Sequence, residues 1–180
     1  MAIISGLTIE DYEKLPDALA LNHELVDGEL VDVSGNTGNH NAFRDLIAAL
    51  LLFYVRDHKL GRVLAEQEYQ FGDNANGPDV SFFGAGKMQL YNGNLRVQRF
   101  VPDLAIEIVS QTDRFEALMK KGQRYREHGT REVWIFSIGL RLAHVLATRG
   151  WVVLDENEQF SSDLIPGFSI RIGDLFDRIQ

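Results

Sequence analysis

The segment Pro102–Ser110, with the sequence PDLAIEIVS, constrains the fold of this chain more than any other stretch. Every second residue from Leu104 to Ile108 is apolar and shares one face of the expected strand, while Glu107 lies between apolar neighbours on the other face. A strand that is apolar on both faces belongs inside a covered sheet. Burying a carboxylate there costs free energy unless a cation or hydrogen-bond donors compensate it. Glu107 therefore predicts a polar site inside the fold.

The order of the remaining patterns predicts an α/β fold whose mixed β-sheet is flanked by helices. Before this strand we expect a helix over residues 8–20 capped by Thr8, an N-terminal hairpin turning at Asp27-Gly28 and a helix from Thr37 to His58. A strand over 62–71, a turn over 72–77 and a strand opening at Pro78 follow. After it we expect a helix ending at Gly129, a strand over 131–137, a C-terminal antiparallel meander of strands over 142–147, 151–154 and 165–172, and a helix over 174–179. The helix between the strands at 102–110 and 131–137 makes that pair parallel. No linker or internal repeat interrupts this order, so we expect one domain over residues 1–180.

Composition and charge narrow the class of protein. With 45% hydrophobic and 24% charged residues, the 180-residue chain matches a globular protein with one core. It has no cysteine, no apolar run long enough to cross a bilayer and no secretory signal, so we expect a cytoplasmic location. The net charge of −8 argues against a protein that coats nucleic acid. Residues 87–131 nevertheless hold nine Lys and Arg against five Asp and Glu, which would suit an anionic substrate or reflect ordinary surface cations.

Two further charged residues point to the same place as Glu107. Asp79 opens a strand after Pro78, and Lys121 lies on the flank of the apolar stripe of the helix that follows PDLAIEIVS. Its neighbour Lys120 falls on the outward face, so of these two lysines only Lys121 can turn toward the sheet. Two carboxylates and one lysine suffice for metal-assisted phosphodiester hydrolysis. Asp and Glu oxygens suit Mg²⁺ or Mn²⁺, and a lysine can orient the attacking water or neutralise charge in the transition state.

These segments resemble the PD-(D/E)XK nuclease superfamily and, more closely, the bacterial family called "putative restriction endonuclease". The matching pieces are HELVDGELVDVS, the helix that carries His40, GPDVSFF, PDLAIEIVS, KGQRYREHGTREVWIF and IPGFSI, which together span about residues 20–172. The resemblance implies a restriction-endonuclease-like core and hydrolysis of phosphodiester bonds in DNA. It also implies Asp79 and Glu107 as ligands of Mg²⁺ or Mn²⁺, the main-chain carbonyl of Ile108 as a further ligand, and Lys121 as the catalytic lysine.

One position departs from the short motif of the superfamily. Val109 stands two residues after Glu107, where that motif has its lysine, and in this family the lysine is displaced to the following helix as Lys121. Asp103 shares the face of Glu107 and competes with Asp79 as a ligand. The candidate substrate contacts are His40, Ser110, Arg114 and Arg124. A structural role for the histidine and helix capping for the serine stay open as alternatives.

Three functions fit these patterns. The first is a magnesium-dependent DNA endonuclease, which would act as a homodimer because cutting both strands invites two sites. The second is a catalytically inactive protein that keeps the nuclease fold and binds nucleic acid. The third is an accessory protein that acts through its acidic N-terminal surface, since residues 1–34 hold eight Asp and Glu against Lys14. Cleavage of plasmid DNA with Mg²⁺ or Mn²⁺ separates the first function from the second, and pull-down partners that depend on residues 1–34 would favour the third.

Overall fold

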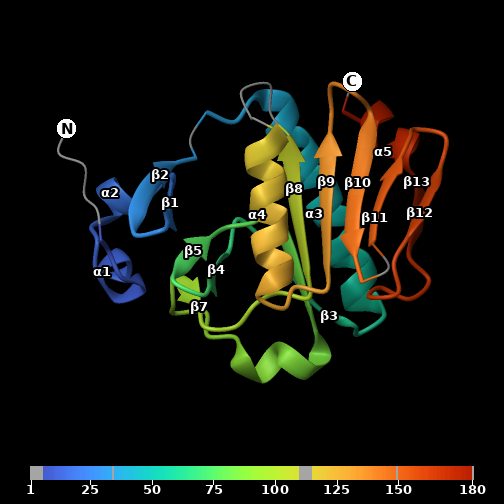
Figure 1. Cartoon of the computed structure of the whole chain (residues 1–180). Coiled ribbons are helices and arrows are strands. Elements are labelled where there is room, and N and C mark those ends of the chain that lie inside the picture. Colours follow the sequence, from blue (N-terminus) through green and yellow to red (C-terminus); the bar gives the residue numbers. More distant parts are fainter. Residues whose placement is uncertain (1–5, 34, 110–114, 149, 180) are drawn as a thin grey trace.

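A six-stranded mixed sheet forms the centre of the fold in the computed structural model, which describes residues 6–33, 35–109, 115–148 and 150–179. The strand order is β11-β10-β9-β8-β6-β3. Helix α3 (Gly38–Asp57) covers one face of this sheet and helix α4 (Phe115–Glu127) covers the other (Figure 1). The strands are β3 (Gly61–Ala65), β6 (Val80–Gly84), β8 (Leu104–Val109), β9 (Glu132–Ser137), β10 (Leu142–Ala147) and β11 (Gly150–Leu154). The predicted α/β fold with a mixed sheet flanked by helices is confirmed.

Strand β8 lies in the middle of this sheet, between β9 and β6. It pairs parallel with β9, with Ile106 opposite Trp134, and the connection between these two strands runs through α4. It pairs antiparallel with β6, with Val80 opposite Ile106. Strands β9, β10 and β11 follow one another in antiparallel order. The parallel crossover and the first part of the meander are therefore confirmed.

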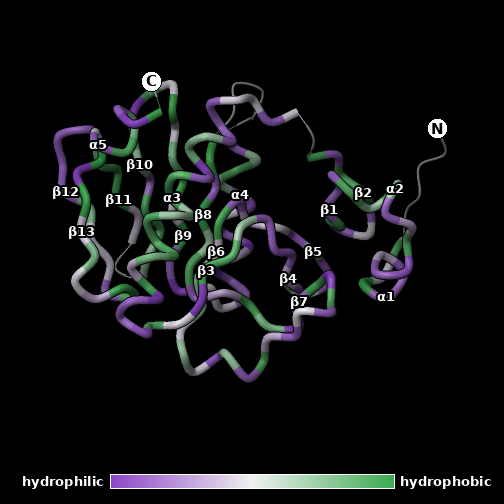
Figure 2. Tube along the Cα trace, turned by 180° about the vertical axis from the view of Figure 1, so that it is seen from behind, coloured by the Kyte–Doolittle hydropathy of each residue, from purple (hydrophilic) through white to green (hydrophobic). Residues whose placement is uncertain are grey.

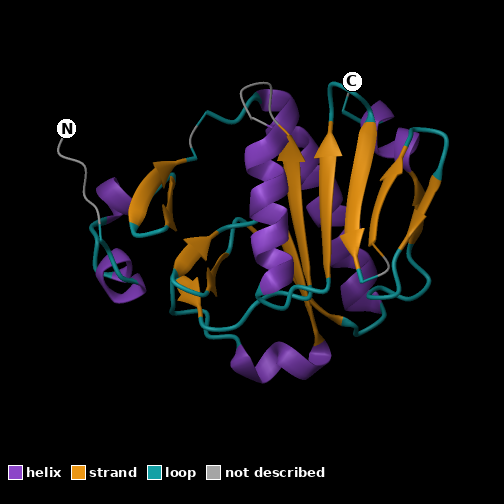
Figure 3. Ribbon diagram, viewed as in Figure 1, coloured by secondary structure: helices purple, strands orange, loops and turns teal. Residues whose placement is uncertain are grey.

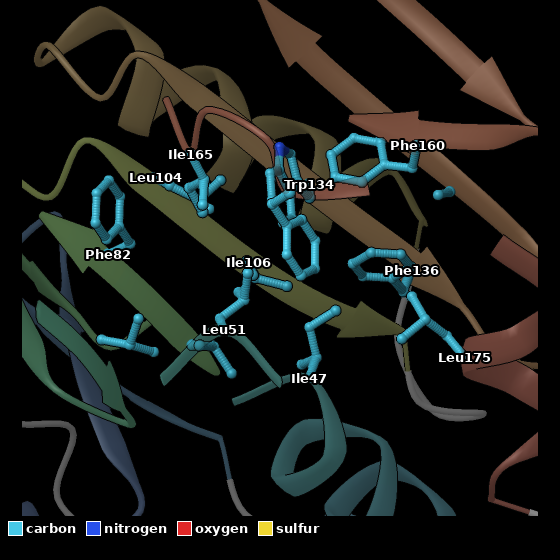
Figure 4. Close-up of a cluster of buried hydrophobic side chains, with 14 of the residues drawn as sticks. Ile47, Leu51, Phe82, Leu104, Ile106, Trp134, Phe136, Phe160, Ile165 and Leu175 are labelled. Atoms are coloured by element: carbon cyan, nitrogen blue, oxygen red, sulfur yellow. The ribbon is translucent and has the colours of Figure 1, made fainter. Parts of the chain in front are cut away.

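The two faces of the sheet have separate cores. On the α3 face, Phe43, Ile47 and Leu51 of the helix pack against Leu104, Ile106 and Ile108 of β8, together with Trp134 and Phe136 of β9 (Figure 4). On the α4 face, Tyr125 packs with Ala105, Val133 and Ile135, and Tyr69 and Phe71 of β4 join this smaller cluster. The alternation predicted for this strand is confirmed, since Leu104, Ile106 and Ile108 belong to the core on the α3 face and Ala105 and Val109 to the cluster on the α4 face.

A second sheet in the order β2-β1-β5-β4-β7 lies beside α4 and carries the N-terminal part of the chain (Figures 1 and 3). The predicted hairpin is present as β1 (His23–Val26) and β2 (Glu29–Asp32), and its turn residues Asp27 and Gly28 have φ values of 51° and 79°. Asp and Gly tolerate such left-handed backbone angles, as a two-residue hairpin turn requires. The other strands are β4 (Glu68–Phe71), β5 (Asn74–Asn76) and β7 (Val97–Gln98). A 3-10 helix at Ala85–Leu90 connects β6 to β7.

Several predicted boundaries are wrong. The helix expected over residues 8–20 is two short helices, α1 (Ile9–Glu13) and α2 (Asp17–Ala20), because Pro16 lacks the N–H that a continuous helix needs. The cap at Thr8 is confirmed, since its side chain accepts from the Asp11 N–H. The strand expected over 62–71 breaks at Glu66, whose φ is 53°, so that β3 and β4 belong to different sheets. Residues 74–76 form β5 instead of a turn.

The C-terminal part also differs from the prediction. Residues 165–172 do not extend the meander. Strand β13 (Ser169–Arg171) pairs with β12 (Gln159–Ser161) in a separate two-stranded sheet, and Phe160 and Phe168 beside them cover the α3-side core. Helix α5 (Ile172–Asp177) buries Leu175 and Phe176 against the same core, as the sequence predicts for a terminal helix. The tube coloured by hydropathy shows how apolar segments alternate with polar ones along these elements (Figure 2). None of the described helices is long and apolar enough to span a membrane.

Candidate active site

The register between β6 and β8 places Asp79 beside Glu107. Val80 lies opposite Ile106, so one step further along the same antiparallel register Asp79 comes opposite Glu107 and faces the same side of the sheet. The main-chain N–H of Ile108, the residue after Glu107, donates to Asp79 Oδ2 at 2.8 Å. This bond fixes the Asp79 carboxylate against the end of β8.

Helix α4 brings two side chains to Glu107. Lys121 and Tyr125 are four residues apart and therefore share one face of the helix. The Lys121 Nζ lies 3.0 Å from Glu107 Oε1 and 3.2 Å from Oε2, and the Tyr125 hydroxyl donates to Oε1 at 2.8 Å. Gly122 lies on the face that meets the sheet, where a Cβ would contact Val133, Ile135 and Leu146.

Glu24 of β1 is a third carboxylate at this site, and sequence reasoning missed it. A carboxylate in a short hairpin is exposed by default, but only 6% of the surface of Glu24 is accessible. Its Oε1 lies 2.9 Å from Lys121 Nζ and accepts the Gly77 N–H at 2.9 Å, while its Oε2 accepts from Asn76 Nδ2 at 3.0 Å. The contact arises because β1 pairs with β5, the strand that the sequence indicated as a turn.

His40 contacts the other side of Asp79. Its Nε2 lies 3.3 Å from Asp79 Oδ1, and only 2% of the residue is exposed. The residue lies in the first turn of α3, where the Thr37 side chain accepts from its main-chain N–H at 3.3 Å. Both oxygens of Asp79 therefore have neighbours within the protein, one on His40 and one on the Ile108 N–H. This arrangement holds the carboxylate in one orientation.

Burial and neighbouring charges shift the pKa values of the groups at this site. Burial raises the pKa of the Glu107 carboxyl to about 8, Lys121 opposes that rise, and Asp79 and Glu24 add to it. Burial alone would lower the pKa of the Lys121 amine, but Glu107 and Glu24 hold it well above its ordinary value. Burial also raises the pKa of the Tyr125 hydroxyl, with Glu107 as the next cause. The lysine is therefore a permanent cation, and the carboxylates around it can accept a further positive charge.

These groups lie at a cleft of about 810 Å³ between the N-terminal hairpin and α4. His40, Asp79, Glu107, Lys121 and Arg124 all line it. The Arg124 Nη1 also donates to Asn76 Oδ1 at 3.3 Å, which connects it to the amide that holds Glu24. The remaining predicted substrate contacts, Ser110 and Arg114, lie outside the described residues.

Asp103, the competing ligand, has a different role. It lies at the opposite end of β8 from the cleft, where its Oδ2 accepts the Gly84 N–H at 2.8 Å and its Oδ1 lies 2.9 Å from Lys87 Nζ. The same lysine donates to the Val101 carbonyl oxygen at 2.8 Å. Asp103 and Lys87 therefore fasten the start of β8 to the loop that follows β6.

The chemistry of the donor set fits a divalent cation. Glu24, Asp79 and Glu107 offer carboxylate oxygens, the ligands that Mg²⁺ and Mn²⁺ prefer. Ile108 lines the cleft although its side chain is buried in the α3-side core, so its main chain is the part that borders the cleft. Among the described residues no group of three His, Asp or Glu side chains already has the arrangement of a metal-binding cluster. The carboxylates instead surround Lys121.

The comparisons with known proteins agree with this architecture. No curated protein matches the chain. A crystal structure described as that of a putative nuclease from Anabaena variabilis superposes with a TM-score of 0.86, at 22% sequence identity, over 97% of this chain and 99% of that chain. At this identity the likeness shows a shared nuclease-type fold. The family model of Uma2, described as "Putative restriction endonuclease", matches residues 9–173, and the chain therefore belongs to this family.

Proposed function

We propose that this protein is a metal-dependent endonuclease that hydrolyses phosphodiester bonds in DNA. The observation that carries the proposal is the position of the Lys121 amine, 3.0 Å from Glu107 and 2.9 Å from Glu24, next to Asp79 at a cleft. The lysine that the short superfamily motif would place at residue 109 thus reaches the same carboxylate from α4. Membership of a family described as restriction endonuclease supports this assignment.

Asp79, Glu107 and the main-chain carbonyl of Ile108 are the groups that we propose to hold Mg²⁺ or Mn²⁺, and Glu24 is a fourth candidate. A divalent cation held there would lower the pKa of a water molecule and offset negative charge on the reacting phosphate. The geometry of the site supports this assignment, because the carboxylates of Glu24 and Glu107 both lie within 3.0 Å of the Lys121 amine and Asp79 lies next to Glu107 in the register of β6 and β8.

Lys121 acts as a cation in this proposal and not as a base. Its pKa is held above the ordinary value, so the amine keeps its proton throughout the neutral range. A protonated amine can donate to a phosphate oxygen or to the attacking water and can stabilise the charge that develops in the transition state. Glu107 and Glu24 position it at the cleft.

Tyr125 and His40 are positioning residues. The Tyr125 hydroxyl donates to Glu107 and leaves the remaining lone pairs of that carboxylate free to accept other partners. His40 contacts Asp79 from the first turn of α3. Each holds one carboxylate in a single orientation, as a site that must bind a cation with defined geometry requires.

The test is cleavage of DNA in Mg²⁺, in Mn²⁺ and in EDTA, with the DNA supplied both as supercoiled plasmid and as circular single strands. We expect wild-type protein to cut at least one of these forms in either metal and neither form in EDTA, and we expect no products with Asp79→Asn or Lys121→Met. Lys14→Met is the matched control, because Lys14 is an exposed lysine at the end of α1. Calorimetry with Mn²⁺ provides a second readout, in which Asp79→Asn loses heat of binding.

A catalytically inactive, nucleic-acid-binding protein is the alternative that this experiment separates. DNA binding without cleavage in either metal, together with no heat of Mn²⁺ binding, would replace the endonuclease assignment by that alternative. Cleavage that survives in Asp79→Asn would show that the activity comes from another site or from a contaminant.

A further inference from the structure

The two walls of the cleft differ in chemical character. Helix α4 supplies one wall, with Lys120 and Arg124 beside Lys121. The end of α2 and strand β2 supply the other, with Leu21, Val31 and Val33, whose exposed fractions are 63%, 42% and 40%. One wall is therefore cationic and the other presents apolar side chains to the opening.

The apolar wall is unsuited to a phosphate backbone. Asp32 lies between Val31 and Val33 on this wall, and residues 1–34 hold eight Asp and Glu against a single lysine. Duplex DNA carries a charged backbone on both sides, and proteins that bind it release counterions through many Lys and Arg contacts. Of the two walls, α4 is the one that offers such contacts.

The depth and size of the cleft also limit the substrate. Glu107 and Glu24 are only 4% and 6% exposed, so the bond to be cleaved must enter the cleft to approach them. The volume of about 810 Å³ is in the range of sites that enclose small-molecule ligands, roughly 300–1,000 Å³. A space of this size accepts a short segment of one strand.

We propose that the substrate is single-stranded DNA, whose phosphates lie along Lys120 and Arg124 while its unpaired bases contact Leu21, Val31 and Val33. A single strand has the same asymmetry as the cleft, with charge along one edge and apolar base faces along the other. This inference rests on the proposed nuclease function and specifies its substrate. One active site then suffices, and cleavage does not need two copies of the chain.

Binding is measured without cleavage, by fluorescence anisotropy of a short labelled oligonucleotide in Ca²⁺ and again in EDTA. The same sequence is presented as a single strand and as a blunt duplex, and an RNA single strand is included to compare the two sugars. We expect the single strand to bind at least about tenfold more tightly than the duplex. Replacing Leu21, Val31 and Val33 together by serine should lower single-strand affinity by about tenfold, because apolar contact area with the bases is lost. The control makes the same change at Leu140, Val152 and Val153, which are exposed apolar residues outside the cleft lining.

The outcomes separate this inference from the proposed function. Equal affinity for the two forms, tighter binding of the duplex, no binding of either form, or an unchanged affinity in the triple-serine variant overturns the inference. Cleavage of duplex and single strand at the same rate in Mn²⁺ also overturns it and leaves the endonuclease assignment standing. A preference for the single strand without cleavage of any DNA keeps the binding site and removes the nuclease activity. Tighter binding of RNA than of DNA overturns the choice of DNA.

Discussion

The two faces of β8 show how one strand serves two different requirements. Toward α3 its side chains are apolar and meet apolar side chains of the helix and of β9. Toward α4 the same strand presents Glu107, which meets Lys121 and Tyr125. The residues of both faces are almost completely buried. The two faces differ in the kind of side chain that is buried, and therefore in whether the free energy of burial stabilises or destabilises the fold.

Burial of apolar surface on the α3 face stabilises the fold by roughly 25 cal/mol per Å². Burial of three carboxylates and a lysine on the other face costs desolvation free energy, which their mutual attraction only partly offsets. Strand β8 tolerates this desolvation cost because its pairing with β6 and β9 and the α3-side core hold it in place. Changes on the α3 face should therefore alter stability, and changes on the α4 face should alter activity.

The largest effect on stability is expected from Phe136→Ala on the α3 face. The ring is fully buried and lies 5.2 Å from the ring of Phe43, so its removal leaves a cavity in close-packed surroundings. We expect the free energy of unfolding to fall by about 3–5 kcal/mol, measured by urea denaturation. Single-turnover cleavage by the protein that remains folded should not change.

A loss below about 1 kcal/mol would contradict the close packing of this face. Leu140→Ala is the control, because this leucine is 69% exposed and its removal should not affect unfolding.

The next largest effect is expected from Lys121→Met on the α4 face. Methionine keeps the length of the side chain and removes the charge that Glu107 and Glu24 surround. We expect kcat for DNA cleavage to fall by about 100- to 1,000-fold, since a preorganised donor to the reacting group is lost.

Lys120→Met tests whether the neighbouring lysine of the same helix has the same role as Lys121. Its side chain lines the outer part of the cleft, so we expect a higher KM and an unchanged kcat. Equal losses of kcat in both variants would contradict the distinct position of Lys121.

A pH-dependent effect on stability is expected at Glu68, a partly buried carboxylate at the start of β4. Burial raises its pKa to about 7 from 4.5, although the Tyr12 hydroxyl that bonds to it at 2.8 Å opposes this rise. The folded protein therefore holds a proton that the unfolded chain has released between these two values. This contribution to stability is complete below pH 4.5 and is lost as the pH rises through 7.

Glu68→Gln removes the titration and keeps the shape of the side chain. Relative to wild type, we expect its free energy of unfolding to increase by up to about 3 kcal/mol between pH 5 and pH 8, measured by urea titrations across that range. A difference between the two proteins that does not change with pH would show that Glu68 is ionised in the fold.

The smallest effect is expected from Tyr125→Phe, which removes only the hydroxyl that donates to Glu107. The expected loss of activity is about two- to tenfold, the value of one hydrogen bond. Tyr69→Phe is the matched control, because its hydroxyl bonds to Ser81 at 2.8 Å in the interior and away from the cleft. If both variants lose activity equally, Tyr125 has no role beyond stability.

Local pattern was enough to predict the central part of the fold. Residues close together in the sequence determine three of these features: the alternation in PDLAIEIVS, the spacing of apolar residues on α3 and α4, and the Asp27-Gly28 turn. Asp79, Glu107 and Lys121 are adjacent in the structure because the β6–β8 register and the β8–α4–β9 crossover bring them there. The register and the crossover both follow from the order of the helices and strands along the chain.

Long-range pairing explains what the sequence did not predict. The burial of Glu24 was not predicted, because the strand that pairs with its hairpin, Asn74–Asn76, lies in a segment rich in Asn and Gly that indicated a turn. That strand forms because it pairs with β1 and β4, and the conformational propensities of its own residues do not predict it. The break at Glu66 and the separate β12–β13 sheet have the same origin, since tertiary contacts decide them.

The central claim is that the carboxylates around Lys121 bind a divalent cation. It is tested most directly by a crystal of the protein soaked in Mn²⁺ and measured for anomalous scattering. We predict an anomalous peak at the cleft, within bonding distance of the Asp79 and Glu107 carboxylates and with the Lys121 amine beside it. The peak should be absent from crystals of Asp79→Asn. A cleft without a peak at saturating Mn²⁺, or a peak that persists in Asp79→Asn, would contradict the account.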